Sequence, residues 1–117
     1  MRLLLLVLIV MLSGCSTFNY RSGYPAEAVA SCIAEKWENC GATGFKVPIS
    51  MTRSDNGYFV AFEMDPFVNP MIFGKHPGYS VWADVTDSGS GSATEYYRAM
   101  QISHGRIDKA VKECQQQ

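Results

Sequence analysis

Residues 45–64 decide the fold, and they read FKVPISMTRSDNGYFVAFEM. Apolar and polar side chains alternate over residues 45–53, which is the period of a half-buried strand. Residues 58–64 are apolar on both faces, which favours either a central strand covered on both sides or a strand with an exposed apolar face. The intervening Ser54-Asp55-Asn56-Gly57 is a hairpin turn sequence, because Asn-Gly suits positive φ. Pro48 cannot donate to a ladder, so we expect residues 45–53 to form an edge strand or to be broken at Pro48.

Two further strands follow in the second half of the chain. Residues 79–86 alternate in the same way. Residues 93–100 fit helix or strand, and we choose strand because Tyr96 and Tyr97 are adjacent aromatic residues, which favour β structure. The Ser/Gly-rich residues 87–92 suit a hairpin connection. We therefore predict a four-stranded antiparallel meander.

Helices are expected on either side of this meander. Pro25 suits the first position of a helix over residues 25–39, and Ser103 is a plausible N-cap for a second helix from Ile102 onward. Each helix has one apolar stripe, so both can cover one face of the sheet. The stripes are Ala26, Val29, Ala30, Ile33 and Trp37 in the first helix, and Ile107, Ala110, Val111 and Cys114 in the second. The prediction is a single small α+β domain over residues 25–117.

The N-terminal segment has a different character. Arg2 precedes an unbroken apolar run over residues 3–12, which is short of the roughly 20 residues that span a bilayer. Leu12-Ser13-Gly14-Cys15 then resembles the lipobox of bacterial lipoproteins. The resemblance implies that residues 1–14 are a signal peptide, that the chain is cut before Cys15, and that lipid is attached to the Cys15 thiol. By the same resemblance, Ser16 favours the outer membrane, on the periplasmic side.

Residues 15–24 show no apolar period, and we interpret them as a lipidated tether that reaches about 30 Å at most. The formal net charge is −1, and it becomes −2 when Arg2 leaves with the signal peptide. No strong positive field exists to attract nucleic acid. The expected partners are the membrane, through lipid on Cys15, and an envelope protein.

Export places the remaining cysteines, Cys32, Cys40 and Cys114, where disulfides persist. An odd number predicts one pair and one free thiol. We prefer Cys32–Cys114 slightly to Cys40–Cys114, because Cys114 lies on one apolar stripe and Cys32 borders the other. Pairing Cys32 with Cys40 is the least favoured, because about 12 Å of helix separates them, which is far beyond the reach of a disulfide. The spacing of the three cysteines does not match the usual zinc-ligand patterns, and His76 and His104 are isolated in the sequence. We therefore predict no metal site and no cofactor.

Residues 65–78 combine three prolines and two glycines with strongly apolar side chains. The segment either folds over the core as an Ω-type loop or contacts a partner or the bilayer. The candidate contact residues are Phe67, Val68, Met71, Ile72 and Phe73.

No sequence pattern of a hydrolase or metalloprotease occurs. We interpret His76 and His104 as surface or capping residues. Asp84 and Glu95 can face each other as paired carboxylates, although outward-facing solvated charge is the simpler interpretation. The chain is therefore expected not to be an enzyme.

The predicted function is a lipid-anchored, non-enzymatic binding or structural module of the cell envelope. The alternative is a small periplasmic inhibitor of a hydrolase such as lysozyme. Ser90-Gly91-Ser92 is similar to the serine-glycine loop of lipid-anchored lysozyme inhibitors, but the Tyr-x-Cys strand pattern of those inhibitors does not occur here.

Overall fold

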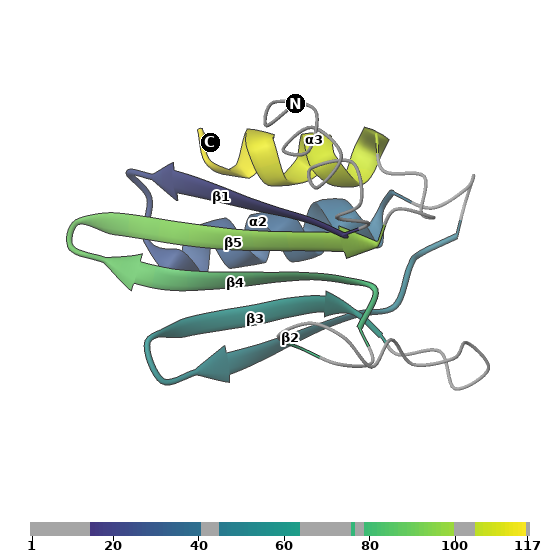
Figure 1. Ribbon diagram of the computed structural model, residues 1–117, viewed down its shortest axis with the longest axis horizontal. Coiled ribbons are helices and arrows are strands. Elements are labelled where there is room, and N and C mark those ends of the chain that lie inside the picture. Colours follow the sequence, from purple (N-terminus) through teal and green to yellow (C-terminus); the bar gives the residue numbers. More distant parts are fainter. Residues whose placement is uncertain (1–14, 41–44, 64–75, 77–78, 100–104, 117) are drawn as a thin grey trace, which may run out of the picture.

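A computed structural model describes residues 15–40, 45–63, 76, 79–99 and 105–116. These residues form an α+β fold with one antiparallel sheet and two helices (Figure 1). The elements in chain order are β1 (Cys15–Ser22), α2 (Ala26–Glu38), β2 (Ile49–Ser54), β3 (Gly57–Phe62), β4 (Val81–Ser88), β5 (Gly91–Ala99) and α3 (Gly105–Cys114).

The sheet has five strands in the order β1-β5-β4-β3-β2. The predicted meander is confirmed as the consecutive neighbours β2, β3, β4 and β5, and β2 lies at an edge as Pro48 required. The predictions of four strands and of a helix as the first element were wrong. Residues 15–22, which we had interpreted as part of a tether, pair along their whole length with β5.

The added strand has a physical cause. Phe18 and Tyr20 alternate with Asn19 and Arg21, and both aromatic side chains pack against the main core. This two-residue alternation is the strand period, but it is too short to stand out in the sequence. Pairing with β5 also satisfies backbone groups that a tether would leave to water.

The main core lies between the helices and one face of the sheet. The expected stripes of both helices are buried, and Trp37 is fully inaccessible to solvent. They pack against inward-facing residues of the strands: Val60, Val81, Ala83, Val85 and Tyr96. Both helices therefore contribute to one core on the same side of the sheet. Ser103, the expected N-cap, lies outside the described residues.

Two glycines are required at the hairpins for different reasons. Gly89 has φ +62°, which fits the first central position of a type II′ turn. Gly57 lacks the positive φ expected from Asn-Gly; instead, a Cβ there would collide with the carbonyl oxygen of Val85 in β4. Gly57 thus permits the close approach of β4.

Strand β2 begins four residues later than predicted. The N–H of Val47 donates to the carbonyl of Glu38 at the end of α2, at 2.8 Å. This bond ties the segment to the helix before Pro48, so pairing with β3 starts only at Ile49. Phe45, expected to be half-buried, is 78% exposed.

Candidate binding surface on the open sheet face

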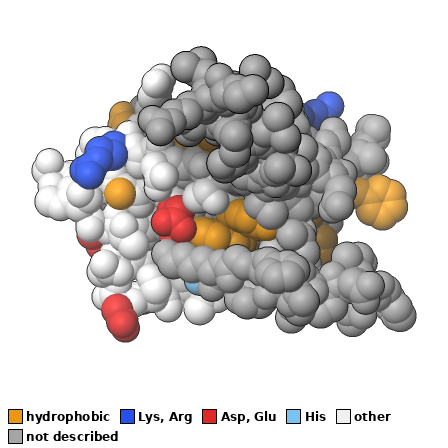
Figure 2. All heavy atoms as spheres, in the orientation of Figure 1, with side chains coloured by type: hydrophobic (Ala, Val, Ile, Leu, Met, Phe, Trp, Pro, Cys, Tyr) orange, Lys and Arg blue, Asp and Glu red, His pale blue; other side chains and the backbone are white. Residues whose placement is uncertain are grey.

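One face of the sheet is covered by neither described helix, and we call it the open face. Side chains alternate along each strand, so the residues that oppose the core side chains point to this face. The register aligns them in cross-strand rows. The middle row contains Asn19, Glu95, Asp84, Phe59 and Thr52. Figure 2 views the open face, where acidic side chains border hydrophobic ones.

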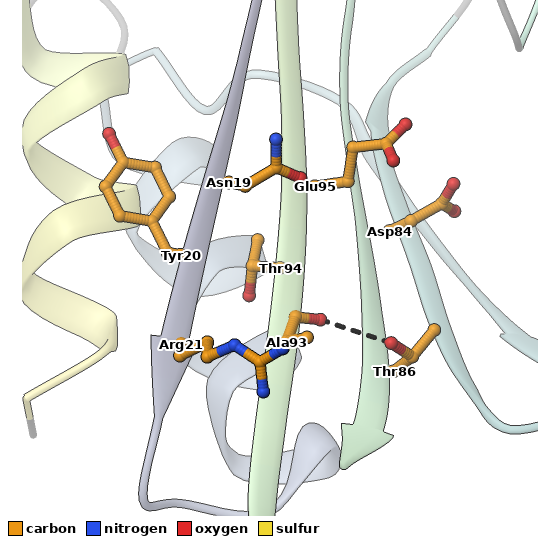
Figure 3. Close-up of a pocket in the computed structure, with 8 residues that line it drawn as sticks. All are labelled: Asn19, Tyr20, Arg21, Asp84, Thr86, Ala93, Thr94 and Glu95. Carbon is orange, nitrogen blue, oxygen red and sulfur yellow. Dashed lines mark hydrogen bonds between the residues drawn. The ribbon is translucent and has the colours of Figure 1, made fainter.

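The open face contains a hollow of about 540 Å³ over β1, β5 and β4. Its floor is low because Ala93 contributes only a methyl group between its cross-strand partners Arg21 and Thr86. Figure 3 shows the lining residues, which are Asn19, Tyr20, Arg21, Asp84, Thr86, Ala93, Thr94 and Glu95. The Tyr20 ring points toward the helix side, and Thr94 is buried.

Asp84 and Glu95 are direct cross-strand partners, which is the less favoured of the two arrangements that the sequence allowed. Figure 3 shows both carboxyl groups on the same side of the sheet. The simpler interpretation of freely solvated charge does not hold for Asp84. Its side chain is 18% exposed, and one carboxylate oxygen lies 2.8 Å from Nε2 of His76.

His76 is also more enclosed than a surface or capping residue. Its ring centroid lies 4.4 Å from that of Phe59 and 4.6 Å from that of Trp82. Trp82 in turn stacks on Tyr97 at 5.5 Å, and both are nearly buried. We call His76, Phe59, Trp82 and Tyr97 the aromatic cluster. The cluster holds the His76 imidazole against Asp84, beside the hollow. The sequence positions of His76 and Asp84 did not indicate that the two side chains pair.

Among the described residues, the most strongly shifted pKa belongs to Tyr96, on the opposite face of the sheet. Burial, and then a hydrogen bond to Asp108, raise the pKa of Tyr96 far above its ordinary value. The Tyr96 hydroxyl donates to Asp108 at 2.5 Å, and Nε of Arg98 donates to the same oxygen at 2.9 Å. The group joins β5 to α3 inside the fold, so its role is structural.

The hollow offers hydrogen-bonding groups of mixed character to a ligand. The Asn19 amide and the Arg21 guanidinium are donors, whereas the Asp84 and Glu95 carboxylates, which also have interactions within the protein, are acceptors. Within the described residues, no group of three or more His, Cys, Asp or Glu side chains is arranged to hold a metal ion. The arrangement is therefore suited to binding a polar segment.

The remaining predicted site residues are distributed as follows. Cys32 and Cys114 form a disulfide with a Cα–Cα distance of 5.6 Å, which confirms the preferred pairing, and Cys40 is free. Cys15 is the first residue of β1 and is paired with Ala99. The candidate contact residues Phe67, Val68, Met71, Ile72 and Phe73 lie outside the described residues, as does His104. Sequence reasoning missed Asn19, Arg21, Thr86 and Ala93. The register of β4 with β5 pairs Thr86 with Ala93, and only the unpredicted β1 adds Asn19 and Arg21 to them.

The described residues form an α+β domain in which neither helix covers the sheet face that contains the hollow. Compared with protein-family models, curated proteins and solved structures, the chain shows no significant match to any of them. None of the helices in the described part of the chain is long and apolar enough to cross a membrane.

Proposed function

We propose that this protein is a lipid-anchored, non-enzymatic binding module of the bacterial cell envelope that uses the open face to hold a partner. The observation that carries the proposal is the hollow on that face. Both described helices pack on the opposite face of the sheet, where they form the main core. Neither of them packs on the open face. A concave surface on which a few polar groups converge is a default candidate for a binding site.

The proposed anchor is lipid on Cys15, and Ser16 supports the outer membrane as its location, on the periplasmic side. More than one acyl chain gives stable attachment. The test is incorporation of a labelled fatty acid in cells. Cys15→Ser should abolish labelling and leave an unprocessed precursor, whereas Cys40→Ser, which removes the free thiol, should label normally. Labelling of the Cys15→Ser chain would contradict the anchor.

The binding surface is tested by filling the hollow. Ala93→Trp adds bulk on the open face without removing a core contact, and Ser31→Trp on the exposed side of α2 is the matched control. A photo-crosslinking residue at Arg21 should give an adduct of defined mass in intact cells. Ala93→Trp should abolish the adduct and Ser31→Trp should keep it, with both variants melting like the parent. An adduct that survives in Ala93→Trp would argue against the hollow.

The second candidate, inhibition of a hydrolase such as lysozyme, is favoured by one feature. The turn between β4 and β5 exposes Gly89 and Ser90 at the tip of a two-residue hairpin. A narrow tip of this kind suits insertion into an active-site cleft. Addition of the purified protein should then slow muramidase digestion of cell walls, and Ser90→Trp should abolish that effect. Digestion at the unperturbed rate would exclude this candidate.

A further inference from the structure

The sheet register places the proposed lipid anchor at one defined end of the molecule. Thr17 shares a cross-strand row with Ser50 through β5, β4 and β3. Strands β1 and β2 run in the same direction (Figure 1). Two residues before Thr17 and Ser50 along the chain, Cys15 and Pro48, which directly precedes β2, therefore lie at about the same level of the sheet. The N–H of Glu63 bonds to the Pro48 carbonyl at 3.1 Å and continues this level into β3.

No spacer separates Cys15 from the folded domain. Strand pairing begins at Cys15 itself, so the predicted tether is not available to hold the sheet away from the bilayer. Acyl chains on Cys15 enter the hydrocarbon directly, and the headgroup layer that they cross is only about 5–8 Å thick. The anchored end of the sheet must therefore lie against or within that layer.

The same end carries the most exposed large hydrophobic side chain among the described residues. Phe45 is 78% exposed, and it precedes Pro48, which stands at the level of Cys15, by three residues. The neighbouring Lys46 is 73% exposed and lies 3.5 Å from Glu38. An aromatic ring next to a long cationic side chain is the combination found at membrane–water interfaces.

The opposite end has a different chemistry. The two hairpin tips, at Asp55 with Asn56 and at Gly89 with Ser90, are exposed and contain no large hydrophobic side chain. The eight residues of β1 separate the two ends by about 25 Å. Tyr24, which is 40% exposed, also lies at the opposite end, and its backbone bonds to Ser22 and Ser92. The described residues thus place their most exposed aromatic ring where the anchor would be, and polar hairpin turns with the less exposed Tyr24 where the aqueous phase would be.

We propose that the lipidated protein docks end-on on the bilayer, with the acyl chains of Cys15 at one edge of the sheet and Phe45, near the other edge, inserted into the headgroup layer. This inference rests on the proposed lipid anchor. It assigns Phe45 to the lipid surface and directs both hairpin tips into the aqueous phase. The strands then run steeply to the membrane, and the hollow on the open face stays accessible from the side.

The test uses the full lipidated chain in vesicles of phosphatidylethanolamine and phosphatidylglycerol that contain a lipid-borne nitroxide quencher. In a Cys40→Ser background, a fluorescent probe is attached at Glu63→Cys, at the level of Cys15, or at Asn56→Cys on a far hairpin tip. The probe at residue 63 should be quenched and the probe at residue 56 should not. Phe45→Ser should reduce quenching at residue 63 by about twofold or more, because removing the ring weakens interfacial seating.

Mass measurement of the purified chain separates the two proposals. If Cys15 carries lipid but both probes are quenched alike, or neither is, or Phe45→Ser has no effect, end-on docking is wrong while the anchor stands. A chain without lipid on Cys15 overturns the anchor and the docking together. Phe45 is exposed, so Phe45→Ser should retain the native circular dichroism spectrum, which serves as the folding control.

Discussion

At the residue scale, Asp108 links the last helix to the helix-facing side of the sheet through two side-chain hydrogen bonds. A single oxygen accepts from the buried hydroxyl of Tyr96 and from Nε of Arg98. The Arg98 guanidinium also lies 5.3 Å from the centre of the Phe18 ring, which brings β1 into the same group. Charge-assisted bonds in a partly buried setting are stronger than neutral ones, so this group fastens α3 to β5 and β1.

The two partners of this bond should differ in their effect on stability. Asp108→Ala leaves a buried hydroxyl and a largely buried guanidinium without their acceptor, and we expect a loss of about 2–4 kcal/mol in the free energy of unfolding. Tyr96→Phe removes only the donor and should cost about 1 kcal/mol. Urea denaturation measures both values, and an equal cost for the two substitutions would show that the carboxylate has no special role.

Cys40 should react slowly with thiol reagents. Burial raises the pKa of the Cys40 thiol, although a backbone hydrogen bond and Arg106 oppose this. The folded state therefore holds the thiol proton more tightly than the unfolded state does. The contribution of the protonated thiol to stability is present below the ordinary thiol pKa and is lost as the pH rises through the pKa of the folded state. Alkylation near pH 8.5 should be several times slower in native protein than in urea with the disulfide intact. Equal rates would contradict the shift.

At the element scale, β1 shows where sequence reasoning fell short and why. The amphipathic stripes of both helices and the alternation in β2 and β4 could be predicted from the sequence, because each repeats over two or more turns or several residue pairs. The disulfide was readable because the helix stripes placed Cys32 and Cys114 near one core. In β1, by contrast, only Phe18 and Tyr20 carry the period, and the strand's contribution depends on contacts with distant β5. The hollow was unpredictable for the same reason, because Asn19 and Arg21 belong to that strand.

Removal of β1 should therefore destabilise a domain that the sequence alone would begin at Pro25. A chain of residues 25–117 loses the packing of Phe18 and Tyr20 and the pairing with β5. We expect it to be less stable than residues 16–117 by about 3–5 kcal/mol, since each aromatic burial contributes about 1.5–3 kcal/mol. Thermal melts of both chains give the comparison. Matching melting temperatures would restore the view that these residues are a dispensable tether.

The disulfide joins α2 to α3 across 82 residues of chain. In the chain-entropy model a loop of that length contributes about 4 kcal/mol. Cys32→Ala with Cys114→Ala should lose about that amount, and the paired substitution prevents Cys40 from replacing either partner. Lys36→Ala, which removes the exposed ion pair with Glu113 between the same helices, should cost far less than loss of the disulfide, because solvent screens exposed ion pairs. A small loss in the double variant would mean that helix packing alone joins the two elements.

At the scale of the whole molecule, the sheet separates two hydrophobic clusters. Trp37 lies in the main core, where its indole N–H donates to the carbonyl of Ile107 at 3.2 Å. Trp82 lies on the open face with Ala61 and Tyr97. Because neighbouring residues of β3, β4 and β5 point alternately into the two clusters, neither cluster can be lost without distorting strands that the other requires.

The two tryptophans should therefore report one unfolding transition. Trp82→Phe leaves Trp37 as the only tryptophan, and Trp37→Phe leaves Trp82. In each variant the fluorescence midpoint in urea should coincide with the midpoint from far-ultraviolet circular dichroism, as two-state unfolding of a small domain requires. Comparison within each variant removes the effect of the substitution on stability. Loss of the Trp82 signal at lower urea than the dichroism signal would show that the open face loosens separately. The hollow would then belong to a locally unstable surface rather than to a preformed one.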